Sequence, residues 1–127
     1  EQGPSCLNQL EGMFAFVLWD RRKRTLYLVR DRLGKKPLYH YWDPSRNLLV
    51  FGSEIKALLA HPHVPRELNH EGICHYLSLQ YVPEPMTAYR GILCVPPGGM
   101  VVYRPREGKL ETSQWWELRP NPADPLP

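Results

Sequence analysis

The sequence has few cysteines and no long apolar run, and each shortage argues against a class of protein. Its three cysteines, Cys6, Cys74 and Cys94, are widely spaced and form no CxxC pair. This odd number favours free thiols in a reducing compartment over a disulfide or a metal site, so we expect a cytoplasmic protein. No apolar stretch approaches the ~18 residues that a membrane span requires, and the first residues do not resemble a signal peptide, so we expect no membrane partner.

The excess of positive charge is also small. Sixteen Lys and Arg residues against 13 Asp and Glu residues give a net charge of +3, which is too little to indicate a nucleic-acid partner. Much of this charge falls in residues 20–24 (DRRKR), and we interpret that run as a solvated turn rather than a nucleic-acid patch. With 43% hydrophobic and 23% charged residues, the composition is that of a globular domain.

Motifs that would mark an independent active site are missing. The sequence contains no GxSxG elbow, P-loop or GxGxxG motif. His61 and His63 lack the HExxH spacing and a carboxylate cluster, which disfavours a metal site, and His40 and His75 are expected to be packed or surface imidazoles. Cys6 has no basic neighbour and lies at the C-terminal end of a predicted helix, where a thiolate is disfavoured. We therefore predict no catalytic residue, metal site or cofactor site in this chain.

Paired apolar runs predict three β-hairpins. Residues 13–19 form an aromatic-rich run too short for a typical helix, and we interpret them as a strand buried on both faces. Residues 4–10 instead favour the last turns of a helix. The predicted hairpins join residues 13–19 to 25–29, residues 38–42 to 48–51, and residues 100–103 to 109–116.

Two helices are predicted between the second and third hairpins. Ser53 is a candidate N-cap, because its hydroxyl can accept a first-turn amide, and Glu54 suits the positive end of that helix. The helix ends near His61, and a second one runs from an N-cap at Asn69 to Leu79. The pattern thus predicts an α+β fold of antiparallel hairpins with two covering helices.

The polar turn after residue 29 should be braced, because charges this close to an apolar sheet need partners. Arg30 is predicted to pair with Glu54, and Asp31 with an amide or with Lys36. Gly34 should adopt a positive φ. We favour a structural role over direct substrate contact for the whole set, which comprises Arg30, Asp31, Gly34, Lys36, Ser53 and Glu54.

Five short strings occur in the order found in glutamine-hydrolysing asparagine synthetases and their amidotransferase relatives. They are GMFAF (12–16), RDRLGKKPLY (30–39), SEIKAL (53–58), YVPEP (81–85) and VPPG (95–98). Each motif alone is weak evidence, but five motifs in the same order as in the family make the resemblance specific. The resemblance covers about residues 3–118.

The resemblance implies part of an N-terminal-nucleophile (Ntn) hydrolase sandwich with α/β/β/α layers. Residues 1–118 would be the C-terminal half of a class II glutaminase domain, and residues 119–127 a Pro-rich linker toward a synthetase domain. In this family a terminal Cys attacks the glutamine amide, with its own α-amino group as base, and ammonia is released. That nucleophile and the glutamine-binding residues would lie upstream of Glu1, so the chain alone is expected to be inactive.

The resemblance also implies a role for Met13, which matches a methionine that lines the family's ammonia route. Ordinary core packing is at least as good an interpretation of Met13 from sequence alone. ATP and Mg²⁺ would act in the parent's synthetase domain, with glutamine as substrate and that domain as partner. Two alternative functions stay open: an amidotransferase with a different acceptor (another carboxylate or a sugar-linked substrate), and a non-catalytic docking module of the same fold. A homodimer is also possible.

Overall fold

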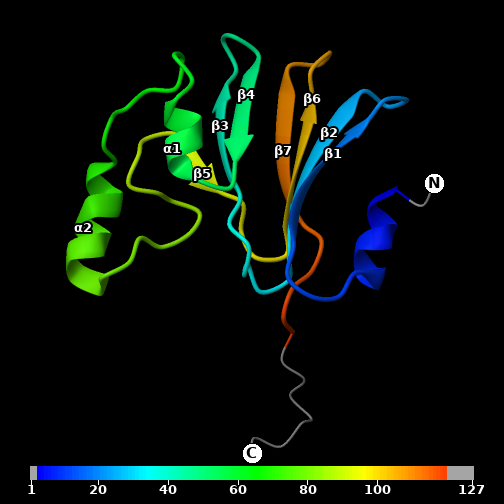
Figure 1. Cartoon of the computed structure of the whole chain (residues 1–127), viewed down its shortest axis with the longest axis horizontal. Coiled ribbons are helices and arrows are strands. Elements are labelled where there is room, and N and C mark those ends of the chain that lie inside the picture. The colour runs from blue at the N-terminus through cyan, green and yellow to red at the C-terminus, as the bar shows by residue number, and fades with distance from the viewer. Residues whose placement is uncertain (1–2, 120–127) are drawn as a thin grey trace, which may run out of the picture.

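The computed structural model describes residues 3–119, which form two antiparallel sheets stacked face to face with helices outside them (Figure 1). The strands are β1 (Ala15–Asp20), β2 (Thr25–Arg30), β3 (Tyr39–Asp43), β4 (Leu48–Gly52), β5 (Ile92–Cys94), β6 (Gly99–Arg104) and β7 (Lys109–Gln114), and the helices are η1 (Gly3–Gln9, 3-10), α1 (Ile55–Leu59) and α2 (His70–Leu79). The larger sheet has the order β1-β2-β6-β7 and the smaller one β4-β3-β5. The predicted α+β class is confirmed. Most of the predicted linker 119–127 lies outside the described residues.

The three predicted hairpins are confirmed as β1–β2, β3–β4 and β6–β7. Strands β2 and β6 pair with Leu28 opposite Val101, and both side chains turn into the space between the sheets. There they pack with Leu38 and Val95, which flank the strands of the smaller sheet. Because side chains alternate across a strand, one face of each sheet builds this shared core.

Helix α1 packs on the outer face of the smaller sheet, and η1 lies on the far side of the larger one (Figure 1). Leu58 of α1 forms a second core cluster with Val64 and with Ile92 of β5. The predicted Ser53 cap is wrong. Glu54 has an extended backbone and occupies the N-cap position without a side-chain hydrogen bond, so helical geometry begins one residue too late for Ser53 to cap it.

Helix α2 begins after Asn69, as predicted, but the Asn69 side chain does not cap it. Its Nδ2 atom donates instead to the Thr87 carbonyl at 3.1 Å. A Cβ on Gly72 would lie 2.7 Å from the same carbonyl, so the glycine permits this close approach. The loop before β5 therefore holds α2, and Tyr76 and Leu77 on the helix stay exposed.

Strand β1 differs from its prediction. It begins at Ala15 rather than Met13 and forms an edge of the larger sheet. Leu18 is 55% and Trp19 44% exposed, so the prediction of a strand buried on both faces is wrong. An edge strand has a neighbour on one side only, and among the described residues η1 alone packs on this outer face near Leu18. The segment predicted as the end of an α-helix is this 3-10 helix.

Strand β5 is the element that the sequence does not predict. It has three residues and completes the smaller sheet by pairing with β3, where Ile92 lies opposite Tyr41. A run this short shows no period, and its partner is distant in the chain.

The three cysteines are free, as predicted, although only Cys94 is buried. Cys6 is half-buried and Cys74 is exposed. No helix of the described part has the length and apolar character needed to cross a membrane.

Candidate functional site: the turn after β2

Arg30 is the centre of a polar cluster at the edge of the core. It ends β2, and its side chain, only 6% exposed, lies on the same face of the strand as Leu28. Nε donates to the Lys36 carbonyl at 2.8 Å, and Nη2 donates to the Gly34 carbonyl at 2.6 Å. Nη1 donates to the Val95 carbonyl at 2.7 Å. One buried side chain thus joins two segments that are far apart in the sequence.

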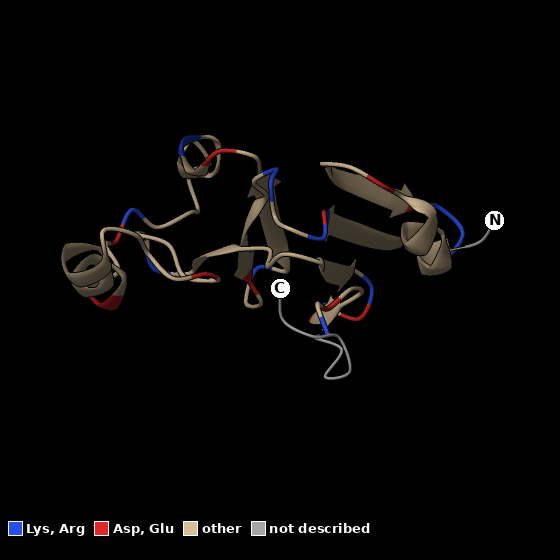
Figure 2. Cartoon of the chain, turned by 90° about the horizontal axis from the view of Figure 1, so that it is seen from below, with Lys and Arg blue, Asp and Glu red and all other residues tan. Residues whose placement is uncertain are grey.

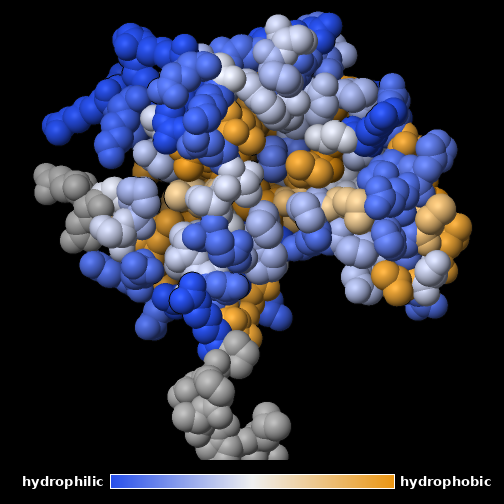
Figure 3. All heavy atoms as spheres, turned by 180° about the vertical axis from the view of Figure 1, so that it is seen from behind, coloured by the Kyte–Doolittle hydropathy of each residue, from blue (hydrophilic) through white to orange (hydrophobic). Residues whose placement is uncertain are grey.

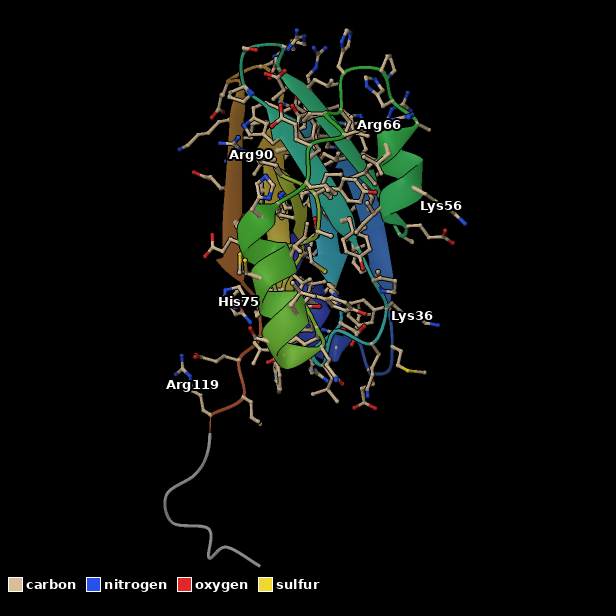
Figure 4. All side chains as sticks on the ribbon, turned by 90° about the vertical axis from the view of Figure 1, so that its left-hand side faces the viewer. Lys36, Lys56, Arg66, His75, Arg90 and Arg119 are labelled. Atoms are coloured by element: carbon tan, nitrogen blue, oxygen red, sulfur yellow. The ribbon has the colours of Figure 1, made fainter. Side chains whose placement is uncertain are left out.

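Glu84 balances the charge of Arg30. Nη1 of Arg30 donates to both Glu84 carboxylate oxygens at 2.9 Å, and Cys94 Sγ lies 3.1 Å from the same nitrogen. The predicted pairing of Arg30 with Glu54 is wrong. Glu54 lies at the solvent-exposed start of α1 and pairs with Lys56 at 2.7 Å, and Figure 4 shows Lys56 pointing outward. The side chain of Arg30 lies on the face of β2 that turns toward the smaller sheet, and there it contacts Glu84 in the loop after α2.

Asp31 fixes the turn that follows β2. The residue is 1% exposed, and its carboxylate accepts backbone amides of Leu33, Lys35 and Lys36 at 3.2, 3.0 and 2.9 Å. Burial by itself raises the pKa of Asp31, but the backbone amides outweigh it and hold the pKa below its usual value. Amide partners for Asp31 were predicted, and they are confirmed.

Gly34 is required at its position for two reasons. Its φ of +63° is the predicted positive value, which side chains other than glycine rarely adopt. A Cβ there would also lie 2.8 Å from Pro97 Cγ and 3.0 Å from Arg30 Cζ. The turn is therefore closed against both the Arg30 cluster and the VPPG segment.

The outer side of the same turn borders a depression of about 430 Å³. Its lining consists of Met13, Phe14, Ala15, Lys36, Pro37 and Ser53. Met13 is 65% exposed and precedes β1, so it is not core filler. Lys36 belongs to both sides, because its backbone contacts Arg30 and Asp31 while its side chain points outward (Figure 4). Met13 thus meets two residues of the predicted brace, Lys36 and Ser53, in this lining.

Sequence reasoning misses Glu84 and Trp115. Trp115 Nε1 donates to the Arg30 carbonyl at 3.0 Å, and its ring stacks on Phe14 with centroids 6.0 Å apart. A signal for Glu84 does exist, because it is a lone carboxylate between Pro83 and Pro85 in the loop after a helix. Nothing local marks Trp115, whose partners lie at the other end of the chain.

Burial keeps two titratable groups near the core, Cys94 and His40, in their neutral forms at neutral pH. Burial raises the pKa of Cys94 to about 11, against the opposing effect of Arg30, so its thiol is protonated at neutral pH. Burial lowers the pKa of His40 to about 4, so this imidazole is neutral. Residues 3–119 contain no group of three or more His, Cys, Asp or Glu side chains that could hold a metal. Most hydrogen bonds of Arg30 and Asp31 go to backbone groups.

The fold and this turn define the class of protein. Two stacked antiparallel sheets with helices outside them are consistent with part of an Ntn-hydrolase sandwich. Residues 1–116 match the model of the glutamine amidotransferase domain, so the chain belongs to that family.

Curated relatives include synthetases and an amidase. Glutamine-hydrolysing asparagine synthetase 3 of Bacillus subtilis is 36% identical over 114 residues, which are 89% of this chain and 18% of the relative. Asparagine synthetase 1 of the same organism is 37% identical over 98 residues, 77% of this chain and 15% of the relative. Amidase chry2 of Gibberella zeae is 35% identical over 117 residues, 91% of this chain and 16% of the relative. The chain spans less than a fifth of the length of each.

Proposed function

We propose that this chain is part of the glutaminase domain of a glutamine-dependent asparagine synthetase. The match of residues 1–116 to the glutamine amidotransferase domain carries the proposal, supported by the synthetase names of its relatives. In the parent, glutamine would supply ammonia and aspartate would become asparagine, with ATP converted to AMP and diphosphate. The parent would be cytoplasmic.

The catalytic machinery would lie in other parts of the parent. A nucleophilic Cys with its own amine as base is expected upstream of this chain, and ATP with Mg²⁺ in a synthetase domain. The protonated Cys94 thiol and the half-buried position of Cys6 in η1 support an inactive isolated chain. The contribution of this chain would be a braced scaffold and a surface for ammonia.

The Met13 depression is the candidate for that surface. An unbranched thioether can line an apolar passage without offering the strong hydrogen bonds that would hold ammonia or admit water. Met13 is exposed and adjoins the sheet edge, and this supports a role at a passage completed by the rest of the parent. Lys36 and Ser53 would lie along the same passage.

A second candidate is an amidotransferase that acts on another acceptor. The 35% identity to amidase chry2 supports this second candidate. The acceptor would be bound outside the glutamine amidotransferase domain, so this domain does not distinguish the two candidates. In either case the glutaminase half is the same.

Ammonia release from glutamine tests the proposal. The purified 127-residue chain should release none, whereas the protein encoded by the whole reading frame should release ammonia and form asparagine from aspartate and ATP. Steady release by the chain alone, abolished by Cys6→Ser, would contradict the proposal. An amide product from a different acceptor would select the second candidate.

A further inference from the structure

The hairpin loops at one end of the larger sheet carry a cluster of five cations. The β1–β2 loop contributes Arg21, Arg22, Lys23 and Arg24, and the β6–β7 loop contributes Arg106. Among residues 3–119, none of these five side chains forms an ion pair or a hydrogen bond. Lys and Arg gather along these loops in Figure 2, and the most hydrophilic atoms lie at the same end in Figure 3.

The nearby carboxylates already have other partners. Glu111 of β7 pairs with Arg104 at 2.6 Å and with Lys109 at 2.7 Å. Within the two loops, Glu107 is the one carboxylate, and it is next to Arg106 in the sequence. Asp20, at the end of β1, is a second carboxylate and lies beside Arg22 and Lys23. Four arginines and a lysine therefore face two carboxylates, which leaves a net positive charge among the described residues at this end.

The β1–β2 loop is held in one shape. Asp20 Oδ1 accepts the backbone amides of Arg22 and Lys23, both at 2.9 Å. Arg24 then adopts a φ of +49°, in the left-handed region, and leads into β2. A side chain that caps its own turn orders the loop before any ligand arrives.

Three of the arginines surround a depression of about 450 Å³ between the two loops. Its lining consists of Trp19, Arg21, Arg24, Pro105 and Arg106. Trp19 is 44% exposed, and its ring makes no aromatic or cation–π contact with other described residues. Arg22 and Lys23 lie in the same loop but do not line the depression.

We propose that this depression binds the phosphate groups of a phosphorylated ligand. A planar guanidinium binds oxyanions through paired N–H groups. A carboxylate can satisfy one such fork, whereas a phosphate offers three acceptor oxygens to several arginines. The ring of Trp19 adds a face on which a base can stack. This site is separate from the turn after β2. Phosphate binding would be a function additional to the proposed glutaminase role.

Titration of the 127-residue chain with sodium tripolyphosphate, followed by calorimetry at about 0.15 M salt, tests the site. Arg24→Gln and Arg106→Gln should each weaken binding about three- to fivefold, as expected for exposed charge pairs. Arg22→Gln is the matched control, because it removes the same charge from the same loop outside the depression, and it should leave affinity nearly unchanged. An equal loss with Arg22→Gln, or the absence of saturable binding, would overturn the proposal.

A second titration with an oligo(dT) single strand separates two sources of phosphate. If the strand binds and Trp19→Leu weakens it about tenfold while tripolyphosphate binding persists, the phosphate belongs to a nucleic-acid strand. If tripolyphosphate alone binds, the ligand is a free phosphorylated molecule. Both results support a phosphate site, provided that affinity depends on Arg24 and Arg106. Binding of either probe that is indifferent to these arginines would overturn it.

Discussion

The turn after β2 has two sides that differ in almost every respect. On the inner side, Arg30 is 6% exposed and each of its guanidinium nitrogens has an acceptor. On the outer side, Met13 is 65% exposed and borders an open depression. Lys36 links the two, since its backbone belongs to the inner side and its side chain to the outer side.

This contrast separates a buried charged motif, whose observed contacts are structural, from an exposed neighbour for which we propose a functional role. On the inner side, hydrogen bonds satisfy buried polar groups and fix the backbone of the turn. These bonds stabilise the folded state. On the outer side the Met13 side chain is mostly exposed and adds little to the core. Changes on the inner side should therefore alter folding, and changes on the outer side should alter function.

Arg30→Ala should have the largest effect on stability. It removes the Arg30 donors from the carbonyls of Gly34 and Val95 and leaves the Glu84 carboxylate with the Cys94 thiol, at 3.6 Å, but without its cation. Breaking a buried pair costs about 3–5 kcal/mol, and we expect the lower end, because the Glu84 side chain is 39% exposed. Urea unfolding measures the loss, and Arg22→Ala in the exposed loop should change it by less than about 0.5 kcal/mol. A similar small change for Arg30→Ala would contradict a brace.

His40 extends the comparison to pH. Its pKa falls from 6.5 to about 4 on folding, so the folded state binds fewer protons than the unfolded state. Its contribution is fully present above pH 6.5 and is lost as pH falls toward 4, in total about 3 kcal/mol. The free energy of unfolding, measured at intervals from pH 7 to pH 4, should show this slope and lose it in His40→Leu. A variant with the same slope as wild type would rule out His40 as its source.

A pair of glycines separates backbone strain from crowding on the inner side. Gly34 and Gly108 have φ values of +63° and +59°, but a Cβ on Gly108 would meet nothing closer than Asn47 Oδ1 at 3.7 Å. Gly108→Ala should cost about 1 kcal/mol from its backbone alone. Gly34→Ala should cost about 1–3 kcal/mol more, since it also overlaps Pro97 and Arg30. Equal losses in unfolding free energy would show that the inner side is not tightly closed.

The smallest effect concerns thiol chemistry rather than folding. Cys94, on the inner side, has a pKa of about 11, against an ordinary value of 9.0, and Cys74 on α2 is exposed. We expect iodoacetamide at pH 8 to alkylate Cys74 readily and Cys94 at least about a hundredfold more slowly. Peptide mass mapping over time measures both rates. Comparable rates would mean that the inner side opens to solvent.

Features of the fold that depend on neighbouring residues could be predicted. Turn residues and short apolar runs located all three hairpins, and Asn69 located the start of α2. The positive φ of Gly34 and the amide partners of Asp31 also follow from the few residues around them. Each of these features depends mainly on residues that are close to it in the sequence.

Features of the fold that depend on residues distant in the sequence could not be predicted. Arg30 selects Glu84 over the predicted Glu54 because of the face of β2 on which it lies, which only the assembled sheets reveal. The exposure of Leu18 on β1 depends on the position of that strand at a sheet edge. The exposed position of Met13 likewise depends on where β1 starts, and sequence alone left core packing as an equal interpretation.

The amount of glutamate formed per amide product tests most directly whether the outer side serves ammonia transfer. In the parent protein, Met13→Lys should leave glutamine hydrolysis nearly intact and raise this ratio, because ammonia escapes before it reaches the acceptor. Leu33→Lys is the matched control, since Leu33, in the turn after β2, is also 65% exposed but does not line the depression. We expect a raised ratio for Met13→Lys and a wild-type ratio for Leu33→Lys. A wild-type ratio in both variants would contradict it.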